Sequence, residues 1–116
     1  MTTARKTAAL IVAAGRGVRA GGGLPKQYRA VRGRTVLART LSRFDRVGIE
    51  RIVVAINPDH GELLQRSIAE ARLSVPVETV HGGAERAGTV QRALEHMAAN
   101  PPANVLIHDA ARPFVP

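Results

Sequence analysis

Four short apolar runs along the chain predict β-strands. The runs are Thr7–Ala14, Arg51–Ile56, Val75–His81 and Asn104–His108. Their lengths, their β-branched residues and the turn residues that close them are typical of strands. Because the first run is apolar throughout, we expect it to be a strand buried on both faces of a sheet.

The segments between these runs predict three helices, because their apolar residues recur at helical spacing. The apolar faces are Val36, Leu37, Thr40, Leu41 and Phe44; then Leu63, Leu64, Ile68 and Ala71; then Val90, Ala93, Leu94, Met97 and Ala98. Strands and helices therefore alternate from the first strand to the last. This order predicts an α/β fold, Rossmann-like, with a mostly parallel sheet and helices on both faces.

Charge is distributed unevenly along the 116 residues, whose net charge is +8. Residues 1–44 hold ten Lys or Arg and no acid, whereas residues 45–116 hold seven basic and nine acidic residues. Such asymmetry favours an anionic partner, either nucleic acid or a phosphorylated small molecule. Aromatic residues make up only 3% of the chain, which argues against a surface that stacks bases. Cysteine is absent, which excludes a thiolate nucleophile or metal site and suits a cytoplasmic protein.

A glycine-rich basic loop follows the first strand. Gly15–Lys26 holds five of the chain's eleven glycines and is followed by Gln27 and Tyr28. Glycine lets a backbone approach phosphate oxygens and direct N–H groups at them, and Arg19 and Lys26 add positive charge. The spacing does not fit a P-loop, and the triple glycine before Pro25 excludes the helix that a dinucleotide fingerprint requires.

Two further motifs follow the third and fourth strands. Gly82–Thr89 combines small residues with a hydroxyl that can bind a ligand or cap a helix. His108–Pro113 places Asp109 at a strand end, where a carboxylate can hold Mg²⁺ together with substrate phosphates. Ligands of open α/β sheets bind beyond the carboxyl ends of the strands, so we expect all three motifs to meet there.

Together these motifs resemble the 2-C-methyl-D-erythritol 4-phosphate cytidylyltransferases of the non-mevalonate isoprenoid pathway. The family pattern is present as A-A-G-R-G-V-R, P-K-Q-Y, G-G-A-E-R-A-G-T-V and H-D-A-A-R-P-F-V. The resemblance implies a nucleotide-diphospho-sugar-transferase type of fold. It also implies transfer of a cytidylyl group from CTP to 2-C-methyl-D-erythritol 4-phosphate, with Mg²⁺ or another divalent cation, in a homodimer that binds neither nucleic acid nor a membrane.

The same resemblance implies roles for particular residues. Arg19 and Lys26 would stabilise the transition state, and Asp109 would hold the metal. The nucleotide would be bound by Ala13, Ala14, Gly15, Gly17, Gly83, Ala84 and Thr89. Three positions depart from the family pattern, which commonly has Met at Ala20, Asp at Gly88 and Ser at Thr89.

The chain stops just past its fourth predicted strand, so we expect residues 1–116 to be the nucleotide-binding, N-terminal part of a truncated domain that is inactive alone. Fused proteins with a cyclodiphosphate synthase begin in the same way. Three alternatives stay open: a non-catalytic fragment, a ribitol-5-phosphate or other sugar-phosphate nucleotidyltransferase, and a basic nucleic-acid binder. The last is supported by the acid-free first 44 residues, and the scarcity of aromatic residues counts against it.

Overall fold

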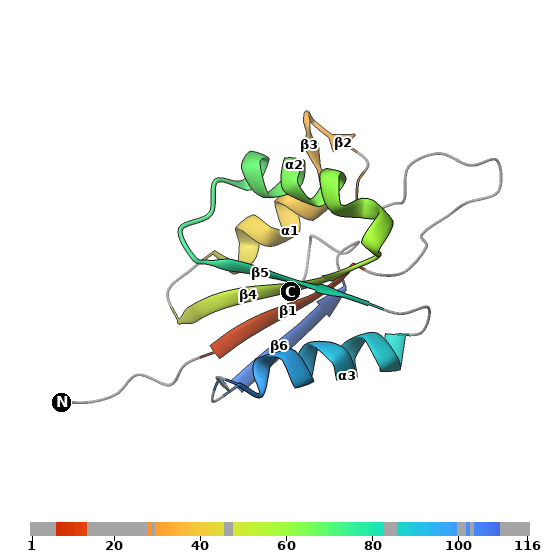
Figure 1. The fold of residues 1–116 in the computed structure, drawn as a ribbon. Helices are drawn as coiled ribbons and strands as arrows, with labels where there is room; N and C mark the ends of the chain where they lie inside the picture. The colour runs from red at the N-terminus through yellow and green to blue at the C-terminus, as the bar shows by residue number, and fades with distance from the viewer. Residues whose placement is uncertain are drawn as a thin grey trace.

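The computed structural model describes residues 7–13, 28, 30–45, 48–82, 86–99, 102 and 104–109. Its centre is a four-stranded parallel sheet in the order β5-β4-β1-β6, drawn edge-on in Figure 1. The strands are β1 (Thr7–Ala13), β4 (Ile49–Ile56), β5 (Val77–His81) and β6 (Asn104–Asp109). The four predicted strands are therefore confirmed, with bounds that shift by one or two residues.

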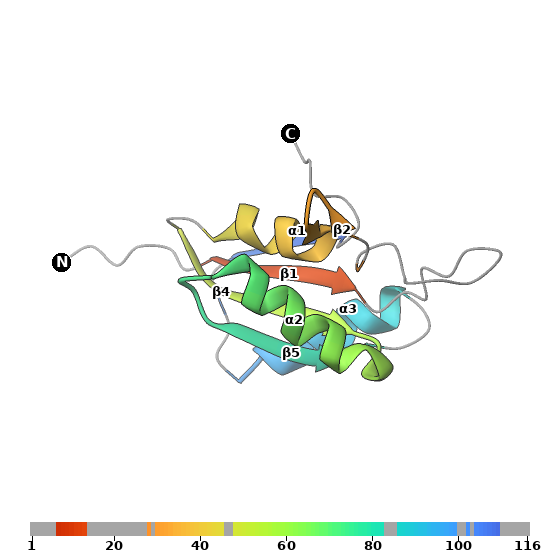
Figure 2. The ribbon, with the colours of Figure 1, turned by 90° about the horizontal axis from the view of Figure 1, so that it is seen from above.

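Helices cover both faces of the sheet. Helices α1 (Val36–Phe44) and α2 (Gly61–Ala71) pack on one face, and α3 (Arg86–Met97) packs on the other. Figure 2, seen from above, shows α1 and α2 side by side. A parallel sheet with helices on both faces was expected, because each parallel connection must cross a face of the sheet.

Strand β1 lies at the centre of the core. Residues 8–11 are fully buried, and Val12 is only 7% exposed. Alternate residues of β1 belong to the two apolar clusters on opposite faces of the sheet. The expectation of a strand buried on both faces is confirmed, and it explains why β1 is apolar throughout.

A small antiparallel hairpin was not predicted. It joins β2 (Ala30–Val31) to β3 (Arg34–Thr35) outside the main sheet. Arg32 and Gly33, between the two strands, have φ angles of 53° and 84°. Two consecutive residues with positive φ form the tight turn that matches the twist of paired strands, and glycine provides one of them. The strands are only two residues long, so no alternating pattern could reveal them.

The buried faces of two helices differ in part from the predicted ones. In α3 the buried stripe is Thr89, Ala93 and Met97, whereas Leu94 is 44% exposed. Thr89 therefore lies inside the helix, which begins at Arg86, and the expectation that it could cap the helix is wrong. In α2, Ser67 is buried because its hydroxyl pairs with that of Thr35 at 2.8 Å, a polar contact that apolar periodicity cannot indicate.

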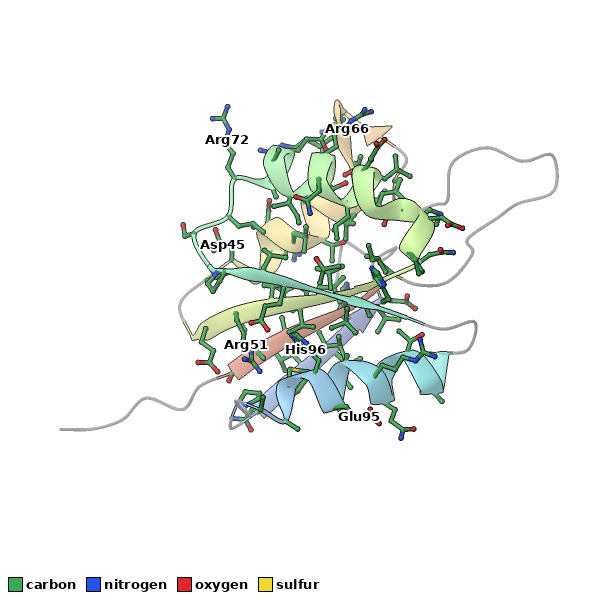
Figure 3. The ribbon with its side chains drawn as sticks, in the orientation of Figure 1. Asp45, Arg51, Arg66, Arg72, Glu95 and His96 are labelled. Carbon is green, nitrogen blue, oxygen red and sulfur yellow. The ribbon has the colours of Figure 1, made fainter. Side chains whose placement is uncertain are left out.

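Polar contacts attach the helices to the sheet and loops. Asp45, which ends α1, accepts hydrogen bonds from the backbone N–H groups of Ser74 at 2.9 Å and Val75 at 3.2 Å. On the opposite face, the Glu78 carboxylate lies 2.8 Å from Nε2 of His96 and 3.6 Å from Nε of Arg51. Figure 3 shows Arg51 and His96 between the sheet and α3.

None of the helices among the described residues is long and apolar enough to cross a membrane.

Candidate nucleotide-binding site

The chain adds strands to the sheet on both sides of β1. From β1 the chain moves to β4 and then to β5 on one side, and it returns through α3 to place β6 on the other side. In open α/β sheets, the crevice for a ligand lies beyond the carboxyl ends of the strands at this point of reversal. The topology therefore indicates a site between the ends of β1 and β6.

Two predicted site residues lie at that position. Ala13 is the last residue of β1, and Asp109 is the last residue of β6. Val12 pairs with Asp109 in the parallel register, so Asp109 and Ala13 lie at the ends of two adjacent strands, whose axes are about 5 Å apart. Asp109 is half-buried at the carboxyl end of the sheet.

The strand register places His108 and Asp109 on opposite faces of the sheet. His108 pairs with Ile11 and contacts the Phe44 ring on the α1–α2 side, at a centroid distance of 5.2 Å. Asp109 pairs with Val12, whose side chain belongs to the cluster on the α3 side. Asp109 therefore shares a face with α3, the helix that the Gly82–Thr89 motif opens.

Thr89 lies in the first turn of α3 and is 1% exposed. It shares a helical stripe with Ala93, and this stripe packs beneath β1 and β4. Any contact of Thr89 with a nucleotide would have to be made from this buried place near the start of the helix.

The remaining predicted site residues lie outside the described residues. They are Ala14, Gly15, Gly17, Arg19, Lys26, Gly83 and Ala84. Their sequence positions nevertheless connect them to described neighbours: Ala14 follows the end of β1, Lys26 precedes Tyr28 by two residues, and Gly83 follows Gly82. Because Gly82 N–H donates to the carbonyl of Ile56 at 2.8 Å, the Gly82–Thr89 motif also begins at the carboxyl ends of the strands.

The carboxyl ends of β4 and β5 also border a groove of about 550 Å³ on the α2 side. Its described lining includes Ile56, Gly61, Leu64, Thr79 and His81. Of the predicted site residues that the structure describes, Ala13, Thr89 and Asp109 are not part of this lining. The groove is largely apolar, and its described lining comes from β4, α2 and β5 rather than from β1 and β6.

One carboxylate at the site suits a magnesium ion that is bound together with phosphates. No group of three or more His, Cys, Asp or Glu gathers within the part of the chain that the structure describes. A metal held only by protein would need such a group, whereas Mg²⁺ commonly uses one or two carboxylates and completes its coordination with water and substrate phosphates. Asp109 fits the second kind of site.

The sheet order and the helices on both faces define an open, Rossmann-like α/β protein, and Asp109 lies beside the end of β1 at the point where ligands of such sheets bind. A model of the 2-C-methyl-D-erythritol 4-phosphate cytidylyltransferase family matches residues 7–116. The chain belongs to this family.

Curated relatives agree with this assignment. The chain is 50% identical over 113 residues to the 2-C-methyl-D-erythritol 4-phosphate cytidylyltransferase of Cereibacter sphaeroides, covering 94% of this chain and 48% of the relative. It is 48% identical over 115 residues to the bifunctional enzyme IspD/IspF of Nitrobacter hamburgensis, covering 98% of this chain and 28% of the relative. The chain thus spans about half the length, or less, of the curated relatives it matches.

A solved structure shows the same fold. The 4-diphosphocytidyl-2C-methyl-D-erythritol synthase of Anaerococcus prevotii superposes with a TM-score of 0.75 at 29% sequence identity. The match covers 96% of this chain and 45% of that protein. The predicted fold class, with a parallel sheet and covering helices, is thereby confirmed.

Proposed function

We propose that this chain is the nucleotide-binding part of an enzyme that transfers a cytidylyl group from CTP to 2-C-methyl-D-erythritol 4-phosphate and releases pyrophosphate. The observation that carries the proposal is the position of Asp109 beside the end of β1, at the reversal of strand order. The complete protein would act as a homodimer in the cytoplasm, as the family resemblance implies.

The reaction requires positive charge rather than a protein nucleophile. A phosphate oxygen of the acceptor attacks the α-phosphorus of CTP, the bond to the β-phosphate oxygen breaks, and that oxygen leaves with pyrophosphate. Negative charge builds on the oxygens around the α-phosphorus as this happens. Arg19 and Lys26 would stabilise that charge, and a divalent cation held by Asp109 would neutralise charge on the phosphates.

The nucleotide itself would be bound by backbone groups and small side chains. Ala13 and the following Ala14, Gly15 and Gly17 would let the phosphates and cytidine approach the end of β1 closely. From the other side, Gly83, Ala84 and Thr89 would border the base. Small residues let the backbone approach the base closely, so that a pyrimidine ring would fit and a larger purine would be crowded. We therefore propose selectivity for CTP.

The test is pyrophosphate release by a protein that contains this chain within a complete cytidylyltransferase domain. We expect turnover with CTP and 2-C-methyl-D-erythritol 4-phosphate, and much slower turnover with ATP or with ribitol 5-phosphate as the acceptor. Asp109→Asn should raise the Mg²⁺ concentration needed for half-maximal rate. Glu95→Gln is the matched control, because Glu95 is exposed on α3 and points away from the sheet (Figure 3).

Equal rates with CTP and ATP would contradict the assignment of the nucleotide. A preference for ribitol 5-phosphate would instead assign the protein the activity of the related sugar-phosphate nucleotidyltransferases.

A further inference from the structure

Tyr28 connects the basic loop to the protein core. It is the only tyrosine in the chain and lies two residues after Lys26. Its side chain is 2% exposed and belongs to the apolar cluster beneath α1 and α2. A bulky ring at the end of a glycine-rich, polar loop has no local reason to be buried, so its burial must come from what it packs against.

The partner of the Tyr28 ring is the imidazole of His60. The two ring centroids are 5.2 Å apart, and the planes meet at 76°, an edge-to-face arrangement. Among the described residues, neither the Tyr28 hydroxyl nor Nδ1 of His60 has a hydrogen-bond partner, although both atoms are buried. Ring packing therefore joins the two side chains.

His60 is itself held by the turn that follows β4. Asn57 Oδ1 accepts a hydrogen bond from the Asp59 N–H at 2.9 Å, and the Asn57 carbonyl accepts one from the His60 N–H at 2.9 Å. Pro58 begins the short 3₁₀ helix η2 (Pro58–His60) and limits its backbone freedom. These contacts hold the backbone of His60 in place at the end of a buried strand.

The same strand end supports the second motif. The carbonyl of Ile56, the last residue of β4, accepts the hydrogen bond from the N–H of Gly82. Gly82 begins the segment that leads to Gly83 and Ala84. Residues 56–60 thus contact one end of each loop to which the proposed function assigns nucleotide binding.

We infer that residues 56–60 position both nucleotide-binding loops, and that His60 and Tyr28 are positioning residues for Lys26. This inference rests on the proposed function. Two residues span at most about 7 Å, so the place of Tyr28 limits where Lys26 can reach. A displacement of about 1 Å in a group that stabilises a transition state can lower the rate about 100-fold.

The experiment uses the complete cytidylyltransferase domain with His60→Ala, His60→Phe, Tyr28→Ala and Tyr28→Phe. We expect each alanine variant to lower kcat about 10- to 100-fold with a smaller change in KM for CTP. Each phenylalanine variant keeps a ring in the contact and should stay within about 3-fold of wild type. His96→Ala is the control, because it removes an imidazole from the opposite face of the sheet.

A second measurement does not depend on activity. Trypsin cleaves after Lys26 and Arg29, which flank Tyr28, and we expect both cleavages to be faster in His60→Ala and unchanged in His60→Phe and His96→Ala. If wild-type protein lacks cytidylyl transfer, the proposed function fails, and this cleavage rate alone decides whether His60 anchors the loop.

Two results would overturn the inference. One is a His60→Ala protein with wild-type kcat and wild-type cleavage after Lys26. The other is a pair of phenylalanine variants as impaired as the alanine variants, since that would show that ring packing is not what connects Tyr28 to His60.

Discussion

At the scale of single residues, Arg19 and Lys26 are distinguished from the other basic residues of the acid-free segment by the loop in which they occur. We predict that Arg19→Ala and Lys26→Ala each reduce kcat of the complete domain about 10²–10³-fold, or roughly 3–4 kcal/mol of transition-state stabilisation. The physical reason is that both charges would act where negative charge develops. Steady-state rates and thermal midpoints measured without ligand provide the comparison.

The control for both variants is Arg34→Ala. Arg34 lies in the same acid-free segment, is exposed, and belongs to the small hairpin. An exposed charge changes stability by only about 0.5 kcal/mol and should leave the rate unchanged. If all three variants behave alike, the segment is a basic surface and the catalytic roles of Arg19 and Lys26 are wrong.

Tyr28 should make stability depend on pH in the alkaline range. Burial raises the pKa of Tyr28 from 10.0 to about 12, because the charged phenolate loses its hydration inside the protein. Between these two pH values the unfolded chain releases the proton and the folded chain keeps it. Ionisation then favours the unfolded state, so this contribution to stability is complete below pH 10 and is lost as the pH rises through about 12.

Denaturant unfolding of wild type and Tyr28→Phe at about pH 9 and about pH 11 tests this prediction. Wild type should lose more stability than the variant across this interval, since phenylalanine cannot ionise. Tyr28 is the only tyrosine, so the difference belongs to this side chain alone. Identical losses in the two proteins would contradict a buried, pKa-shifted hydroxyl.

At the scale of elements, the end of α2 is strained. Arg72, which caps this helix, has φ and ψ of 51° and 58°, the left-handed conformation that usually calls for glycine. We predict that Arg72→Gly raises the free energy of unfolding by about 0.5–1 kcal/mol, because glycine adopts this conformation without steric cost. The Arg72 side chain is exposed and projects away from the body of the protein, so its removal should cost little (Figure 3).

Arg66→Gly provides a control of opposite sign in the same helix. Arg66 is also exposed, but it lies in the helix interior, where glycine costs about 1 kcal/mol. Denaturant unfolding of both variants should show one gain and one loss. Two losses of similar size would mean that the end of α2 is not strained.

These elements also show how far local patterns extend. The helical stripe of α1 places Val36, Leu37 and Leu41 in the core as predicted, because a helix packed on a sheet needs only one apolar face. The end of α2 could not be found in this way, since Arg72 occupies a position where glycine is the usual signal. Thr35 caps α1, because its hydroxyl accepts a hydrogen bond from the Ala38 N–H at 3.0 Å. Threonine is a preferred residue type at this position, but apolar spacing alone does not reveal it.

At the scale of the whole molecule, the described part of the chain exposes apolar surface at one edge of the sheet. Leu106 and Ile107 of β6 are 41% and 45% exposed. We predict that the isolated 116-residue chain binds a hydrophobic dye such as ANS and self-associates in a concentration-dependent manner, because such surface favours burial against another surface. Dye fluorescence and sedimentation velocity measure these two properties.

Ile107→Lys should reduce both dye binding and self-association. Glu95→Gln is the matched control, since it makes the same change of charge on an exposed side chain without removing apolar surface. Unchanged dye binding in Ile107→Lys would show that β6 is not the surface responsible.

The amino-acid sequence by itself determined the four strands of the main sheet and the three helices, and it predicts which residues carry phosphate-binding chemistry. Strands and helices of this kind depend on local periodicity and on residue type, so a strand such as β1 can be recognised without its neighbours. Only the tertiary structure decided that β6 returns beside β1, which brings Asp109 next to Ala13. It also decided that the His60 ring meets the Tyr28 ring, which lies far away along the chain. Strand order and such contacts follow from long-range packing, which no local pattern encodes.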